Sequence, residues 1–182
     1  MAIQTQYLDR HGPPALAMTV VVLRPLCAAA RSAAKPDAKS TRRRNYCTIV
    51  HMIIADTNIF LAVALEEPER DQIIEATRGK DIAAPEILPY ELGNALTAMY
   101  KRRQLSSDQV GAVHGTISRI PVRLMTVDIQ EALHIALQFN LYAYDAYFIQ
   151  CARACGVPLM TLDQRMHRVA SEIGIAVPEG WQ

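Results

Sequence analysis

The sequence predicts an α/β fold in which a mostly parallel central sheet is flanked by helices in a three-layer arrangement. Two observations lead to this prediction. Short apolar runs of strand length alternate along the chain with longer segments of helical periodicity. Acidic residues follow several of these apolar runs or fall where helices begin, and in open parallel sheets the ligands bind beyond the carboxyl ends of the strands.

The strand predictions rest on short apolar runs. MIIA is long enough for a buried parallel strand, and Asp56 ends it. DIAA, VRLMTV and VPLMTL have the same character, and IAV near the end of the chain predicts a short edge strand. The expected strands are residues 52–55, 81–84, 122–127, 157–162 and 175–177.

Helices are predicted between the strands by apolar spacing and by residues that begin or end helices. Pro89 suits a first helical turn, and Ser106 or Ser107 suits an N-cap. Asp128 is expected to cap a further helix, and Gly156 to end the one before the fourth strand. The expected helices are residues 59–67, 69–78, 89–103, one starting after the serine pair, 129–139, 144–154 and 164–173.

The 182 residues suit one domain with an extra segment, and the two parts differ in charge. Residues 1–51 hold eight Lys/Arg and two Asp/Glu, a net +6, whereas residues 52–182 hold eleven and sixteen, a net −5. We therefore expect 1–51 to be a disordered basic N-terminal extension and 52–182 to be the folded domain. A transit-like or nucleic-acid-binding tail is one alternative, and a segment upstream of a true start at Met52 is another.

Cysteine usage and hydropathy indicate the compartment. Cys27, Cys47, Cys151 and Cys155 form no C-x-x-C pair and no dense disulfide framework. A reducing, cytoplasmic location fits this pattern. No run reaches the roughly 18 apolar residues of a membrane span, so no membrane association is expected.

Four acidic residues far apart in the chain stand in similar apolar settings. They are Asp56 in IADTN, Glu91 in PYELGNAL, Asp145 in YAYDAYFIQCA and Asp163 in TLDQR. A carboxylate among apolar neighbours costs several kcal/mol unless it is paired or binds a cation. Helix capping is an alternative for Asp56 and Asp163, and a helix-dipole contact is an alternative for Glu91. Asp145 is the hardest to explain without a ligand.

Such a group of carboxylates suits a hard divalent cation. Mg²⁺ and Mn²⁺ prefer oxygen ligands, and Mg²⁺ keeps several waters. One or two such ions can activate water for phosphodiester cleavage. The acids are expected to meet in one crevice, because strand ends and helix starts share an edge of a parallel sheet.

The four motifs, in this order, resemble those of PIN-domain nucleases, and their spacing is most similar to the VapC-type toxins of bacterial toxin–antitoxin pairs. The resemblance covers 52–182 and leaves 1–51 unmatched. It implies that Asp56, Glu91 and Asp145 bind Mg²⁺ or Mn²⁺, and that Asp163 takes a supporting share. It also implies that small polar neighbours line the site, namely Thr57, Asn58 and Thr161.

The resemblance further implies an endoribonuclease that cuts structured RNA such as tRNA or rRNA, forms a homodimer and is covered by a VapB-like antitoxin. Two other functions stay open on the residues alone. One is a different metal-dependent phosphoryl hydrolase on an α/β fold, and the other is a non-catalytic binding module. The sequence has no G-x-G-x-x-G, no Walker loop and no Ser/His or Cys/His nucleophile signature.

Overall fold

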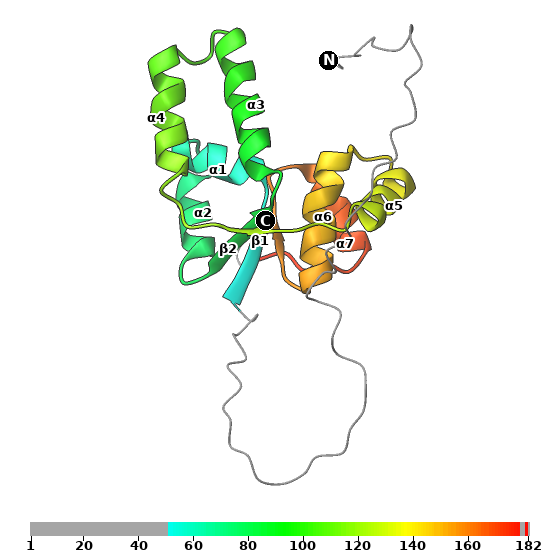
Figure 1. Ribbon diagram of the computed structural model, residues 1–182. Coiled ribbons are helices and arrows are strands. Elements are labelled where there is room, and N and C mark those ends of the chain that lie inside the picture. Colours follow the sequence, from blue (N-terminus) through cyan, green and yellow to red (C-terminus); the bar gives the residue numbers. More distant parts are fainter. Residues whose placement is uncertain (1–50, 179–180, 182) are drawn as a thin grey trace, which may run out of the picture. The chain divides into compact units, whose positions relative to one another are not determined.

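The computed structural model describes residues 51–178 and Trp181, and these residues form a four-stranded sheet with seven helices (Figure 1). The predicted basic extension, apart from His51, lies outside the described residues. The strands are β1 (Met52–Ala55), β2 (Asp81–Pro85), β3 (Arg123–Met125) and β4 (Leu159–Met160). The helices are α1 (Thr57–Ala64), α2 (Arg70–Thr77), α3 (Leu88–Lys101), α4 (Ser107–Ile117), α5 (Ile129–Phe139), α6 (Ala143–Cys155) and α7 (Gln164–Glu172).

The sheet is entirely parallel and has the strand order β3-β2-β1-β4. β1 lies between β2 and β4, pairing Ile54 with Ala83 on one side and with Leu159 on the other. Ile54 and Ala55 are fully buried. Because β1 is central, the residue that follows it, Asp56, emerges in the middle of the carboxyl edge of the sheet.

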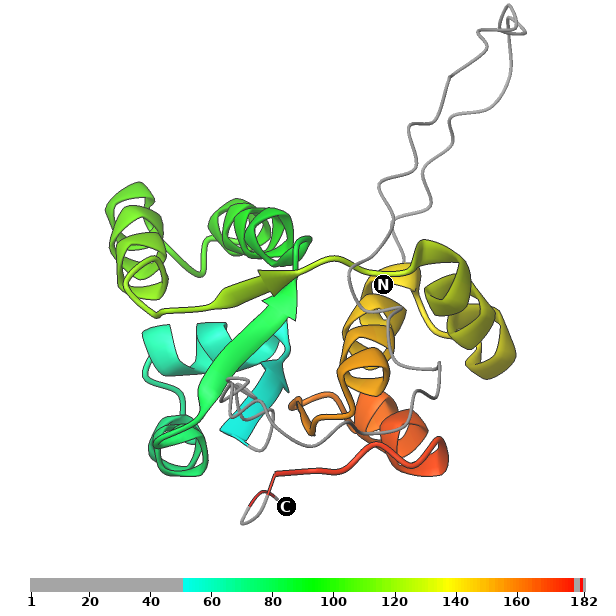
Figure 2. The ribbon, with the colours of Figure 1, turned by 60° about the horizontal axis from the view of Figure 1, so that its bottom comes forward.

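Helices cover both faces of the sheet. α6 packs against β1 and β2, and α5 and α7 pack against α6. Figure 2 shows α1 to α4 gathered on the other side of the strands. The predicted three-layer α/β arrangement with a parallel sheet is therefore confirmed.

Several helix ends follow the predicted chemistry. The Ser106 hydroxyl accepts a hydrogen bond from the Gln109 amide, and the Gln109 side chain accepts one from the Ser106 amide. Asp128 caps α5 by accepting from the Glu131 amide. Gly156 ends α6 in the left-handed conformation with φ of +66°, where a side chain would be strained. None of the helices in the described residues has the length and hydropathy that crossing a membrane requires.

The predicted edge strand at 175–177 is wrong. In the structure these residues belong to no strand, and one backbone hydrogen bond joins the segment to β4, from the Leu159 amide to the Ala176 carbonyl at 3.1 Å. Gly174 turns the chain with φ of +76°, and Pro178 has no amide hydrogen to donate. These two residues leave too short a segment for a ladder against the two-residue β4.

Removing the Ser106 side chain tests whether it caps α4. Ser106→Ala is expected to lower the free energy of unfolding by about 1 kcal/mol, because the first turn of α4 loses its side-chain acceptor. Denaturant unfolding measures the change. Ser107→Ala is the matched control, since the neighbouring serine is also exposed and lies outside the capping pair. Equal losses in the two variants would contradict the assigned cap.

Candidate active site

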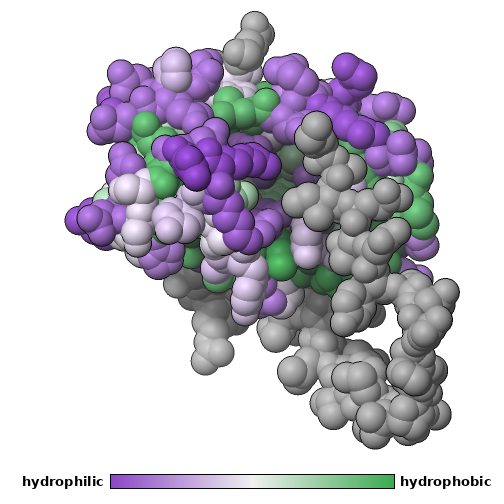
Figure 3. Space-filling model, turned by 90° about the horizontal axis from the view of Figure 1, so that it is seen from above, coloured by the Kyte–Doolittle hydropathy of each residue, from purple (hydrophilic) through white to green (hydrophobic). Residues whose placement is uncertain are grey.

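A cleft of about 420 Å³ opens where β1 ends and where α3 and α6 begin. Three of the four acids singled out in the sequence line it, namely Asp56, Glu91 and Asp145. The other lining residues are Thr57, Asn58, Ile87, Tyr90, Asn94, Ala95 and Tyr144. Figure 3 views the molecule from above, at the end where the strands finish, and hydrophilic residues predominate there with smaller hydrophobic areas between them.

Asp56 is the most buried of the acids, with only 4% of its surface exposed. It occupies the N-cap position of α1, but its side chain makes no capping hydrogen bond. Its Oδ2 atom instead accepts from the Thr161 hydroxyl at 2.9 Å and from the Asn58 side-chain amide at 3.3 Å. Helix capping, one alternative for this residue, therefore does not account for its carboxylate.

Glu91 is half-buried in the first turn of α3, near the positive end of the helix dipole. The Thr57 hydroxyl donates a hydrogen bond to its Oε2 atom at 2.5 Å. Thr57 is the first residue of α1, so this bond joins the helix after β1 to the helix after β2. The two carboxylates thus approach each other from neighbouring strand–helix connections.

Asp145 and Asp163 occupy different settings. Asp145 is half-buried in the first turn of α6 and lines the cleft. Asp163 is exposed and caps α7, with its Oδ1 atom accepting from the Arg165 amide at 2.7 Å and from the Met166 amide at 2.9 Å. Asp163 is not among the lining residues of the cleft, and capping, the alternative named for it, accounts for one of its oxygens.

The pKa values link the acids electrostatically. Burial raises the pKa of Asp56 to about 6, the charges of Glu91 and Asp145 add to the rise, and the bond from Thr161 opposes it. Burial, followed by the charge of Asp145, raises the pKa of Glu91. Burial, followed by the charge of Asp163, raises the pKa of Asp145. Each carboxylate therefore lies close enough to at least one other acid for the like charge to raise its pKa.

The donor chemistry of the cleft fits Mg²⁺ or Mn²⁺. Carboxylate oxygens are the ligands that these ions prefer, and a cation would offset the burial and the like-charge repulsion that raise the three pKa values. In the described part of the chain, however, no three acidic, histidine or cysteine side chains are already arranged as a ready-made ligand set. This agrees with the way Mg²⁺ is held by one or two carboxylates, with water and phosphate completing the shell.

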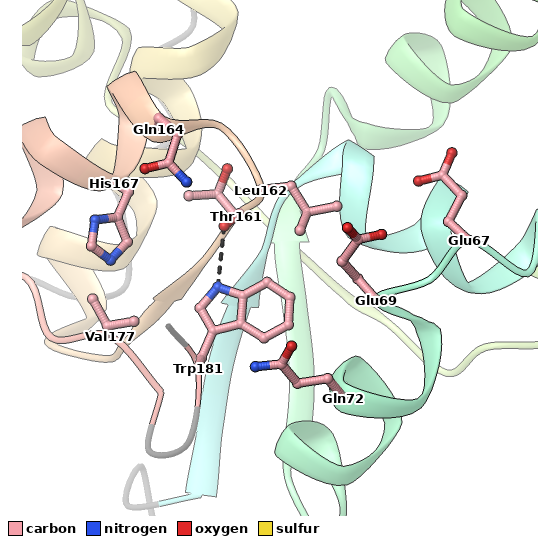
Figure 4. A pocket seen from close by; sticks show the side chains of 9 residues that line it. All are labelled: Glu67, Glu69, Gln72, Thr161, Leu162, Gln164, His167, Val177 and Trp181. Carbon is pink, nitrogen blue, oxygen red and sulfur yellow. Dashed lines mark hydrogen bonds between the residues drawn. The ribbon is translucent and has the colours of Figure 1, made fainter.

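A larger pocket of about 740 Å³ also reaches Thr161 (Figure 4). None of the four acids lines it. Trp181 stands in this pocket and donates from its indole nitrogen to the Thr161 carbonyl at 3.2 Å. This bond holds the backbone of Thr161, whose hydroxyl donates to Asp56, so the two pockets are linked through one residue.

Sequence reasoning found the acids and the small polar residues but not the whole lining. Thr57, Asn58 and Thr161, the polar neighbours that the resemblance implied, all bond to cleft carboxylates, although Thr161 is not among the lining residues of the cleft. Asn94 and the exposed tyrosine Tyr90 were not singled out. Asn94 lies three residues after Glu91 and so shares its helix face, whereas Tyr90 directly precedes Glu91 and has no such spacing.

The chain is similar to several known proteins. The family model for the PIN domain matches residues 53–172, a span that includes all four acids. VapC ribonuclease Mb0985 of Mycobacterium bovis and Ribonuclease VapC9 of Mycobacterium tuberculosis are each 29% identical to the chain over 125 residues, which is 63% of this chain and 88% of each relative. The crystal structure of PAE2754 from Pyrobaculum aerophilum shares the fold, with a TM-score of 0.50, 22% identity, and coverage of 72% of this chain and 89% of that chain.

Asp56→Asn is expected to stabilise the metal-free protein at pH 7.5. The folded pKa of about 6 lies above the unfolded value of about 3.9, so the native state binds the extra proton between these values. The loss of folding stability caused by the ionised Asp56 is absent below about pH 4 and complete above about pH 6. It amounts to at most about 3 kcal/mol, and thermal unfolding in EDTA at pH 4.5 and 7.5 measures it.

Asp128→Asn is the matched control, because Asp128 caps an exposed helix start outside the cleft. We expect no comparable stabilisation from it at pH 7.5. Added Mg²⁺ should raise the melting temperature of the wild type more than that of Asp56→Asn. A wild-type protein that is more stable than Asp56→Asn in EDTA at pH 7.5 would contradict the account.

Proposed function

The chain belongs to the PIN-domain family, and we propose that it is a VapC-type ribonuclease, an endoribonuclease that depends on Mg²⁺ or Mn²⁺ and acts as the toxin of a toxin–antitoxin pair. The observation that carries the proposal is the meeting of Asp56, Glu91 and Asp145 in one cleft, each with a raised pKa. The names of the two mycobacterial relatives support the activity. We assign it to residues 52–182 and to the cytoplasm, with tRNA or rRNA as the substrate.

Asp56, Glu91 and Asp145 would hold the cation, with Asp163 taking a supporting share from outside the cleft, where its charge acts on Asp145. When bound, the cation polarises the phosphodiester and makes a bound water more acidic. The polar neighbours orient the ligands: Thr161 and Asn58 fix Oδ2 of Asp56, and Thr57 fixes Glu91. Such supporting bonds hold ligands in place and raise their usefulness as donors.

The basic end of α3 supports an RNA substrate. Lys101, Arg102 and Arg103 are exposed at the carboxyl end of the helix whose first turn carries Glu91. Lys101 lies ten positions after Glu91, which corresponds to about 15 Å along a helix axis. A phosphate backbone that enters the acidic cleft can therefore reach these cations a few nucleotides away, where they offset the negative charge of the domain.

The direct test is RNA cleavage in Mg²⁺ with tRNA and rRNA as substrates. Asp56→Asn and Asp145→Asn are expected to lower kcat/KM by more than about 100-fold. Removing a residue that only supports a metal ligand costs up to about 100-fold, and removing the ligand itself should cost more. Thr161→Val should cost about 10- to 100-fold, because it frees Asp56 while leaving the carboxylates intact.

Asp128→Asn serves as the matched control for cleavage and should leave the rate unchanged, since this aspartate only caps α5. Equal activity in the wild type, Asp56→Asn and Asp145→Asn would remove the proposed mechanism. A phosphoenzyme trapped on Asp56 would instead identify a different phosphoryl hydrolase.

We propose that an apolar stripe on α5 pairs two copies of the chain. The stripe consists of Ile129, Leu133 and Leu137, which are exposed at spacings of four residues and so share one helix face. Another set of α5 residues is buried, including Ala132 and Ile135, and the helix packs against α6. An apolar face that no element of the described chain covers is typical of a protein contact. A VapB-like antitoxin, as the names of the relatives suggest, is the second protein partner.

Leu137→Glu tests the pairing, because 80% of the Leu137 surface is exposed and its substitution costs the monomer little. Light scattering should give twice the chain mass of 20.2 kDa for the wild type and the single-chain mass for the variant. Ile74→Glu on α2 is the matched control and should stay dimeric. A dimer that survives Leu137→Glu would place the contact elsewhere.

A further inference from the structure

Two exposed tyrosines stand at the rim of the acidic cleft. Tyr90 is 75% exposed and Tyr144 is 53% exposed, and both line the cleft. Each directly precedes one of its acids, Tyr90 before Glu91 on α3 and Tyr144 before Asp145 on α6. Successive helix residues point about 100° apart, so each tyrosine lies to one side of the acid that follows it.

Folding alone gives little reason for these rings. A tyrosine that stabilises a core buries its ring, and its hydroxyl usually finds a partner. Among the described residues neither hydroxyl makes a side-chain hydrogen bond, and Tyr90 leaves most of its surface in water. Tyr144 has one aromatic neighbour, Tyr147, whose ring lies edge-on at 5.9 Å between centroids. This contact steadies the Tyr144 ring and leaves half of its surface free.

The arrangement matches the parts of a nucleotide. The carboxylates of the cleft can meet the phosphate only through a cation, whereas aromatic faces bind the flat faces of bases. The two rings lie on α3 and α6, the helices that also carry Glu91 and Asp145. A phosphate bound at these acids therefore has one aromatic ring close by on each helix. Stacking of this kind tolerates any base but requires a base whose face is free, as in a single strand or a loop.

We propose, on the basis of the nuclease function above, that Tyr90 and Tyr144 stack on unpaired bases next to the scissile phosphate and so direct the enzyme to single-stranded or looped RNA. The two rings act as positioning residues for the substrate. Base-paired RNA cannot use them, because its bases are already stacked within the duplex.

Binding and stacking can be measured without cleavage. The probe is a mixed-sequence ribonucleotide nonamer containing 2-aminopurine, whose fluorescence falls when it stacks on an aromatic ring. Ca²⁺ replaces Mg²⁺, because its looser coordination suits it less to the reaction, and a gel confirms that the probe stays intact. Tyr90→Leu and Tyr144→Leu should each weaken binding about tenfold and reduce the quenching. Tyr90→Phe and Tyr144→Phe should retain wild-type binding and quenching, because the aromatic ring is kept.

Ile74→Ala is the control for trimming an exposed apolar side chain, since Ile74 is 38% exposed on α2 and lies outside the cleft and the basic end of α3. It should change binding and quenching little. In Mg²⁺ the wild type should cleave the free nonamer faster than the same nonamer annealed to its complement, and Tyr90→Leu and Tyr144→Leu should raise KM more than they lower kcat.

The possible failures are distinct. If the wild type cleaves RNA while the leucine variants bind and quench as it does, the stacking role is wrong and the nuclease function stands. The same holds if Ile74→Ala has an equal effect, or if duplex RNA is cleaved as well as single strands. A change in light-scattering mass with unaltered RNA binding would assign the rings to a protein contact. A wild type that neither binds nor cleaves RNA would overturn both proposals.

Discussion

Burial of three carboxylates in one partly dehydrated cleft, with repulsion from neighbouring acids added, is the constraint on which the site depends. Asp56, Glu91 and Asp145 each have a pKa raised first by burial, and for Asp56 and Glu91 another cleft carboxylate adds to the rise. Such a group is unfavourable without a countercharge, because the free energy of removing charges from water exceeds the stabilisation from neutral hydrogen bonds. Hydrogen bonds from Thr57 and Thr161 keep two of these carboxylates in place. The protein thus maintains a local instability that a divalent cation would relieve.

The parallel sheet is what brings these charges together. β1 lies between β2 and β4, so Asp56 at its carboxyl end has neighbours from both adjacent connections. The connection after β2 leads into α3 with Glu91, and Thr161 follows β4 directly. Asp145 arrives from α6, which packs across β1 and β2. A cleft at this edge is therefore a consequence of strand order.

The sequence predicted the acids better than it predicted their roles. Asp56 interrupts an apolar run, and that local anomaly was visible without a structure. Asp163 showed the same signal, yet its oxygen caps α7, because a strand end is also a helix start and both explanations fit one pattern. The bond between Thr161 and Asp56 spans 105 positions and depends on β4 pairing with β1, which no local pattern contains. The exposure of Tyr90 likewise depends on how α3 packs, since an aromatic residue in a helix is more often buried.

The central claim is that the three carboxylates share one cation, and diffraction from crystals soaked in Mn²⁺ tests it most directly. Anomalous scattering locates Mn²⁺ independently of any assumption about its ligands. We expect one strong anomalous peak within coordinating distance, about 2.2 Å, of oxygens from Asp56 and at least one of Glu91 and Asp145. A peak elsewhere, or none at saturating Mn²⁺ near neutral pH, would contradict the claim.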